Sequence, residues 1–194
     1  MNTLAAPIAT GRTPDAVRVA LRRAQAALAF GGAAAVALAA MVLFVTTTSD
    51  GKFQHTGDYF LTANGIAYLL ALLVLLPTLR TLQQRRDGRL GQAGIALTGL
   101  GCVALLVVFV HGLAAATESS LGPTYVLASL ATIVGVALFA AGSWRAGLLP
   151  RWLLPIWVLA WAIGSMLPIL GPGPLLLAAV YLTMAVLLPR RLAA

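Results

Sequence analysis

The stretch "RLGQAGIALTGLGCVALLVVFVH", residues 89–111, indicates the class of this protein. No charged side chain lies between Arg89 and His111. An α-helix needs about 20 apolar residues to cross a hydrocarbon core roughly 30 Å thick. A single segment in lipid must also satisfy its own backbone N–H and C=O groups, which only a helix does. We therefore expect a membrane-spanning helix here.

Apolar runs of this kind recur along the chain of 194 residues, which is 60% hydrophobic and 9% charged. Soluble domains carry about 25% charged residues. We predict an all-α fold, a polytopic membrane protein whose bundle of six transmembrane helices forms one domain, 25–188. The expected spans are about 25–46, 59–79, 92–113, 124–143, 152–170 and 174–188.

A basic segment, 1–24, precedes this domain, and a basic tail, 189–194, follows it. In the first segment, Thr13 has the character of a helix N-cap and Pro14 that of a first helical residue. The segment is therefore expected to contain a short interfacial helix that leads into the first span.

The net charge of +8 is distributed unevenly between the two sides of the predicted membrane domain. All 13 basic residues except Lys52 fall in the two terminal segments or in the loops after the second and fourth spans. By the positive-inside rule both termini are cytoplasmic. The basic excess then reflects topology and attraction to the lipid bilayer, and nucleic-acid binding is not expected.

The residue types of the chain do not favour redox or metal chemistry. Cys102 is the only cysteine, so neither an intramolecular disulfide nor a CxxC pair can form. The two histidines and five acids show no HxxH or HExxH spacing. We therefore expect no metal and no cofactor. Gly94, Gly99 and Gly101, with Gly135 one span later, favour close helix packing instead.

Three ionisable residues on the predicted outer side are candidates for acid and base chemistry. Asp58 stands where the second span begins, and His111 closes the apolar run of the third. Glu118 follows seven residues later, so a continuing helix would place it on the face of His111. Intramembrane ionisable groups usually face the bundle interior or a wet cavity. Asp58, His111 and Glu118 are the candidate catalytic residues.

Five further side chains from neighbouring spans are candidates for the wall of a substrate-binding pocket below this rim. They are Asn64, Tyr68, Tyr125, Trp157 and Trp161. Simpler interpretations stand beside this one. Asp58 can act only as a helix cap, the aromatic residues can act only in packing, and the outer loop "SDGKFQHTGD" (49–58) can be solvated or form a lid.

Three functions fit this pattern. The first is a cofactor-free acid/base enzyme, a cyclase or isomerase, that acts on a lipophilic small molecule such as a terpenoid or polyketide. The second is a small transporter, channel subunit or immunity protein. The third is an accessory subunit whose Gly/Ala-rich helix faces dock a second copy or a partner membrane subunit.

The loops "DGRLGQAG" (87–94) and "SWRAGLLPRW" (143–152) are similar to those of a broad group of small, Arg/Ala/Leu-rich, six-span membrane proteins of high-GC actinobacteria. Most members of that group have no assigned function. The resemblance implies a multi-pass protein of the bacterial inner (plasma) membrane. It supplies no site residues.

Overall fold

The computed structural model describes residues 14–42, 52–53, 56–117, 122–166 and 173–193, which form six α-helices. These are α1 (Pro14–Val42), α2 (Thr56–Leu82), α3 (Gly88–Ala115), α4 (Gly122–Ala146), α5 (Leu153–Met166) and α6 (Gly173–Ala193). Apart from one isolated bridge between Lys52 and Thr117, the described residues contain no β-structure. The predicted all-α class is confirmed.

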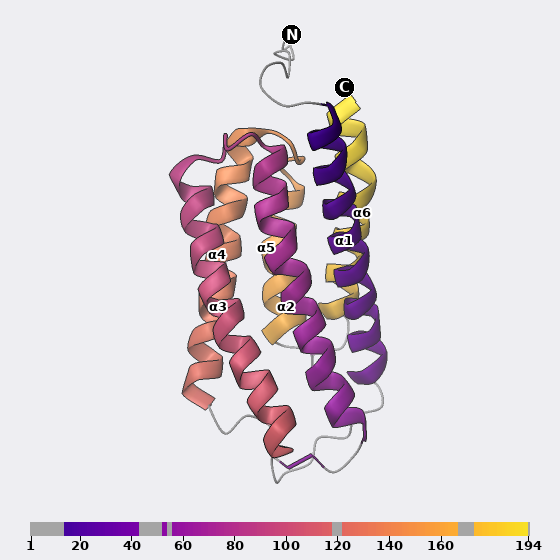
Figure 1. Cartoon of the computed structure of the whole chain (residues 1–194), viewed down its shortest axis with the longest axis vertical. Coiled ribbons are helices and arrows are strands. Elements are labelled where there is room, and N and C mark those ends of the chain that lie inside the picture. Colours follow the sequence, from indigo (N-terminus) through magenta and orange to yellow (C-terminus); the bar gives the residue numbers. More distant parts are fainter. Residues whose placement is uncertain (1–13, 43–51, 54–55, 118–121, 167–172, 194) are drawn as a thin grey trace.

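Five of these helices, α1, α2, α3, α4 and α6, are long and apolar enough to cross a membrane. The described part of α5 is apolar but has only 14 residues. A membrane-embedded helical bundle is therefore supported, while the sixth crossing stays a prediction. The start of α1 and the end of α6 lie at the same end of the bundle (Figure 1).

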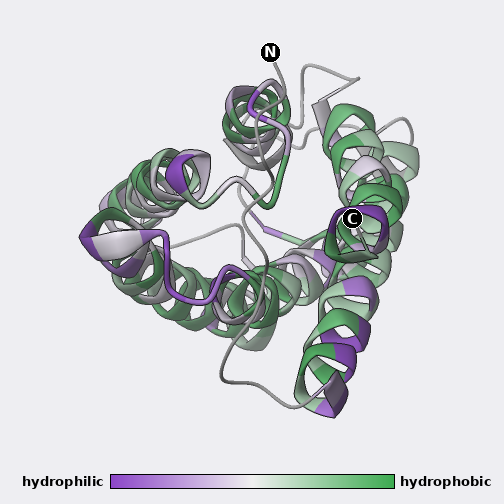
Figure 2. Cartoon of the chain, turned by 90° about the horizontal axis from the view of Figure 1, so that it is seen from above, coloured by the Kyte–Doolittle hydropathy of each residue, from purple (hydrophilic) through white to green (hydrophobic). Residues whose placement is uncertain are grey.

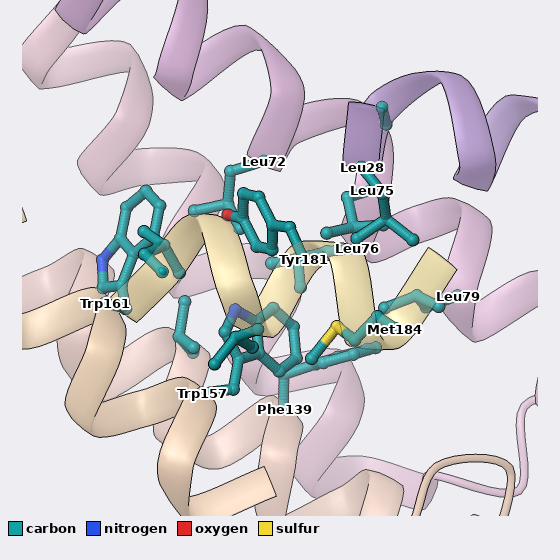
Figure 3. Close-up of a cluster of buried hydrophobic side chains, with 14 of the residues drawn as sticks. Leu28, Leu72, Leu75, Leu76, Leu79, Phe139, Trp157, Trp161, Tyr181 and Met184 are labelled. Atoms are coloured by element: carbon teal, nitrogen blue, oxygen red, sulfur yellow. The ribbon is translucent and has the colours of Figure 1, made fainter. Parts of the chain in front are cut away.

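The helices form a ring in chain order. Each helix packs against the next one, and α6 returns to pack against α1 (Figure 2). Large side chains from different helices fill the interior, as Figure 3 shows for Leu72, Phe139, Trp157 and Tyr181. All four are fully buried. The ring therefore encloses a packed aromatic and aliphatic core.

The N-terminal basic segment differs from its prediction. Residues 14–24 are not a separate interfacial helix but the first turns of α1. Between Pro14 and Gly31 there is no glycine or proline to interrupt the helix. Ala20 and Ala24 are buried in the hydrophobic core, so this segment packs within the bundle.

Glycines bring α3 and α4 into close contact. A Cβ atom on Gly94 would lie 2.5 Å from the backbone N of Phe139 and 2.7 Å from the backbone O of Gly135. A Cβ on Gly101 would lie 2.7 Å from the backbone O of Ala128. These distances are too short for any side chain, so the two backbones touch directly. Around Gly99 there is open space, so this glycine does not belong to the contact.

One end of the bundle, here called the arginine-rich end, comprises the start of α1, the α2–α3 and α4–α5 turns and the end of α6. Asp87 is buried there and pairs with Arg80, with 3.4 Å between Arg80 Nε and Asp87 Oδ2. The Gln83 side-chain amide donates a hydrogen bond of 2.8 Å to Ser143 Oγ. Polar side chains thus tie the α2–α3 turn to α4.

Candidate functional site

A cavity of about 160 Å³ lies among the helices in the half of the bundle away from the arginine-rich end. Residues of α2, α3, α4 and α5 supply most of its wall, and α1 adds Leu38. The lining residues are mainly apolar, with a few polar groups between them. They are Leu38, Leu61, Thr62, Asn64, Gly65, Tyr68, Leu69, Leu105, Phe109, Tyr125, Ser129, Thr132 and Trp161. We call this the inner cavity.

A second space of about 240 Å³ adjoins it toward the end of the bundle. The two share four lining residues, Leu61, Thr62, Phe109 and Tyr125, which form the boundary between them. The second space is further lined by Phe53, Asp58, Val108, Gly112 and Thr117. We call it the outer cavity.

Stacked aromatic rings form one wall of the inner cavity. Tyr68 and Trp161 stack with their ring centroids 5.2 Å apart and their planes 22° apart. The Trp161 indole N–H donates to Thr132 Oγ1 at 3.3 Å, and Thr132 Oγ1 donates to the Ser129 carbonyl oxygen at 2.8 Å. These bonds fix the orientation of the Trp161 ring. The wall is therefore a rigid apolar surface.

Most polar groups around the inner cavity are already occupied. The Asn64 side-chain amide donates to the Ala34 carbonyl oxygen at 2.7 Å, which ties α2 to α1. Thr62 Oγ1 donates to the Asp58 carbonyl oxygen at 3.0 Å. The Tyr68 hydroxyl is different, because this buried group has no hydrogen-bond partner among the described residues. Buried hydroxyls nearly always have a partner, so the unpaired Tyr68 hydroxyl is an exception among these polar groups.

Gly65 shapes the cavity from one side. A Cβ atom there would lie 2.7 Å from Cε2 of Phe109, so the missing side chain allows the Phe109 ring to lie against α2. The Phe109 ring also lies 6.3 Å from that of Tyr125, centroid to centroid. Neither Gly65 nor Phe109 was identified from the sequence. The glycine directly after Asn64, within an apolar span, is the signal that could have indicated a close approach here.

A short extended segment lies beside the outer cavity. The Phe53 backbone N–H donates to the Ala116 carbonyl oxygen at 2.8 Å, and Lys52 bridges to Thr117. The Phe53 ring contacts that of Tyr59 edge to face at 4.9 Å. Ala116 takes up a left-handed conformation (φ 51°) where α3 ends, and this turns the chain toward Phe53. Lys52 and Phe53 therefore lie beside the end of α3, and a lid function for the loop 49–58 stays a prediction.

The predicted substrate-binding residues divide into two groups. Asn64, Tyr68, Tyr125 and Trp161 all line the inner cavity. Trp157 is fully buried but is not among the lining residues, and its ring packs edge to face on Phe139 at 6.1 Å. Its indole N–H lies near the Tyr181 hydroxyl, but the pair lacks hydrogen-bond geometry. Trp157 belongs to the core rather than to the cavity wall.

The structure describes two of the three candidate catalytic residues, and it does not place both of them on one cavity. Asp58 is buried in the first turn of α2 and lines the outer cavity. His111 lies on an exposed part of α3 and lines neither cavity. The reason is helical phase: Val108 and Gly112 face inward, and His111, next to Gly112, points about 100° away. Glu118 lies outside the described residues.

Within the described parts of the chain, no three His, Cys, Asp or Glu side chains gather where they could hold a metal ion. No protein-family model, curated protein or solved structure matches the chain. The fold defines the class as an α-helical membrane protein, and the site is defined by the two cavities alone.

Proposed function

We propose that this protein binds a neutral, lipophilic small molecule that carries a hydrogen-bond acceptor. The observation that carries the proposal is the unpartnered hydroxyl of Tyr68, a residue that lines the mainly apolar inner cavity. A ligand oxygen placed against this hydroxyl would complete its hydrogen bonding. The stacked Tyr68 and Trp161 rings would receive the apolar body of the ligand.

The ligand should be uncharged in the part that enters the inner cavity. None of the described residues around that cavity is charged, and an unpaired charge in apolar surroundings is strongly disfavoured. The volume of about 160 Å³ is comparable to the roughly 150 Å³ cavity that holds a benzene ring in another protein. A larger ligand would extend past Phe109 and Tyr125 into the outer cavity.

The proposed setting is a bacterial plasma membrane, with the arginine-rich end in the cytoplasm. This orientation rests on the positive-inside rule, since all basic residues but Lys52 belong to that side. The two cavities would then occupy the outer half of the membrane. A lipophilic ligand would reach them from the bilayer or from the outer surface.

Binding is tested with Nile red, a neutral lipophilic dye that carries a carbonyl group, and the purified protein in neutral detergent. We expect Tyr68→Phe to raise the dissociation constant about three- to tenfold, the equivalent of one hydrogen bond of about 0.5–1.5 kcal/mol. The matched control is Tyr59→Phe, on the exposed side of the same helix, which should bind like the unmodified protein.

The two parts of the proposal fail in different ways. If the unmodified protein shows no saturable dye binding, the cavity is not a site for such ligands. If binding is saturable but equal in Tyr68→Phe and Tyr59→Phe, the site exists and the Tyr68 hydroxyl does not contribute to it.

A second candidate function, acid catalysis on the bound ligand, is favoured by the position of Asp58. A buried carboxyl group that lines the outer cavity can deliver a proton to a ligand alkene or carbonyl. In an isomerisation or cyclisation of this kind the ligand gains one proton from the acid and loses another to a base. His111 and Glu118 remain candidates for that base.

This second function predicts isotope exchange. Membranes that contain the protein, incubated in D₂O, should incorporate deuterium into one extractable lipophilic compound, and Asp58→Asn should abolish that incorporation. Mass spectrometry of the extracted lipids detects the labelled compound by its mass shift, whatever its identity. Equal deuterium incorporation with the unmodified protein and with Asp58→Asn would show that Asp58 does not catalyse the exchange, and binding alone would remain as the proposed function.

A further inference from the structure

A separate small pocket of about 80 Å³ opens at the arginine-rich end of the bundle. The α2–α3 turn, the α4–α5 turn and the end of α6 all contribute to its wall. Its lining includes Gln83, Arg86, Gly147, Arg191 and Leu192. The two turns carry the loop motifs "DGRLGQAG" and "SWRAGLLPRW", so segments far apart in the sequence meet at this pocket.

Backbone conformation decides which arginines reach the pocket. Gln84 and Arg85 both adopt left-handed conformations, with φ of 54° and 60°. Two such residues in succession reverse the chain direction, and Arg86 lines the pocket while Arg85 does not. In the last turn of α6, likewise, only one of two neighbouring arginines reaches the pocket: Arg191 lines it and Arg190 does not. Non-glycine residues with positive φ are uncommon, so this turn is a specific feature of the chain.

The side chains that line the pocket carry a net positive charge. Arg86 and Arg191 are its charged lining residues, and both are exposed. The adjacent acid, Asp87, is buried and already pairs with Arg80. Figure 2 shows that hydrophilic residues gather at this end of the bundle. Two guanidinium groups, with no free carboxylate among the described residues that line the pocket, favour a phosphate group.

Gln83 indicates a second chemical group that the ligand of this pocket should carry. This residue is 3% exposed, and its side-chain N–H is used by Ser143. Its side-chain oxygen, Oε1, is buried and has no hydrogen-bond partner among the described residues. An acceptor of this kind fits a hydroxyl donor. A group with both a phosphate and a hydroxyl would satisfy the two arginines and Gln83 together.

A separate apolar groove lies further along α6. Residues spaced seven apart share one face of a helix, and Leu192 of the pocket has Ala185 and Ala178 below it on this face. Both alanines line a groove of about 360 Å³ between α1 and α6, together with Ala33 and Gly32. Ala185 lies about 10 Å along the axis from Leu192. The spacing suits an acyl chain that descends from a headgroup.

We propose that this pocket binds the headgroup of an anionic phospholipid that carries a free hydroxyl, such as phosphatidylglycerol, with one acyl chain in the α1–α6 groove. Arg86 and Arg191 hold the phosphate, and Gln83 accepts a hydrogen bond from the hydroxyl. This site is independent of the two cavities near the other end.

The test measures lipid binding to the purified protein in neutral detergent by native mass spectrometry. Arg86→Gln and Arg191→Gln should each raise the dissociation constant for phosphatidylglycerol about fivefold, the effect of one basic residue at an anionic membrane surface. The matched controls are the neighbouring arginines: Arg85→Gln and Arg190→Gln remove the same charge outside the pocket and should have much smaller effects. Equal effects in all four variants would overturn the proposal in favour of general charge attraction.

Two further arms identify the ligand chemistry. Phosphatidylmethanol has the same charge as phosphatidylglycerol but no headgroup hydroxyl, and it should bind several-fold more weakly. Equal binding of the two lipids would overturn the role of Gln83. Millimolar inorganic phosphate should not displace phosphatidylglycerol, because it lacks the acyl chain. Efficient displacement would show that the pocket takes a free anion and not a lipid.

Discussion

Replacement of Arg80 by glutamine is expected to lower the free energy of unfolding by about 3–5 kcal/mol, the largest effect of any change considered for this protein. The Asp87 side chain is 0% exposed, and Arg80 is the cation that pairs with it. Without Arg80 the carboxylate stays buried with no compensating charge. A buried charge that loses its partner is strongly destabilising, whatever the net value of the intact pair.

The measurement is SDS-induced unfolding in mixed micelles. Asp87→Asn in the Arg80→Gln background should restore most of the lost stability, because it removes the unpaired charge. Arg89→Gln, an exposed arginine at the start of α3, is the control and should change stability little. A double variant as unstable as Arg80→Gln alone would show that the burial of Asp87 is not the cause.

The second large effect is expected from Gly94→Ala, which should destabilise the bundle by about 3 kcal/mol, at the upper end of the usual cost of overpacking. The added methyl group would meet the backbone atoms of Phe139 and Gly135, and neither can turn aside as a side chain would. The α3 and α4 helices would have to separate along their contact. An alanine in a helix is otherwise favoured over glycine by about 1 kcal/mol, so the sign of the effect is informative.

Gly99→Ala is the matched control for this substitution. It lies on the same helix, five residues away, and its added methyl group meets nothing within 4 Å. The same SDS titration should find Gly99→Ala equal to or more stable than the unmodified protein. If both variants lose stability equally, the close α3–α4 contact is not what the glycine at position 94 provides.

The architecture could be predicted from the sequence because membrane spans depend on composition and length. The apolar runs and their flanking arginines located all six helices to within a few residues, apart from the start of α1. There the basic residues suggested an interfacial helix, whereas Ala20 and Ala24 are buried in the core. A helix with a charged face beside a narrow alanine face can lie at the membrane interface or pack within a bundle. Only the neighbouring helices decide which of the two occurs.

Helix packing and site geometry were harder to predict from the sequence, because they depend on how each helix is rotated about its axis. The sequence indicated that the glycines of α3 make close contacts, but it could not separate Gly94 from Gly99. The same uncertainty of about 100° per residue affected His111, which lies beside the inward face rather than on it. Tyr68, Asn64, Tyr125 and Trp161 surround one cavity, and their part in binding stays a prediction. The sequence places Asp87 among several arginines, but it could not indicate that Arg80, at the other end of the turn, is its partner.

The closure of the ring by α1 and α6 has a consequence for how the protein is made. Tyr181 of α6 fills the centre of the bundle, where a Cβ on Gly31 of α1 would lie 2.7 Å from its ring. The ribosome delivers α6 after the other five helices, so the synthesis of four helices separates Gly31 from the core residue that packs against it. Until α6 inserts, the nascent bundle has an unfilled interior and α1 an unpaired flank. A bundle that lacks α6 therefore also lacks the Tyr181 side chain that packs against Gly31.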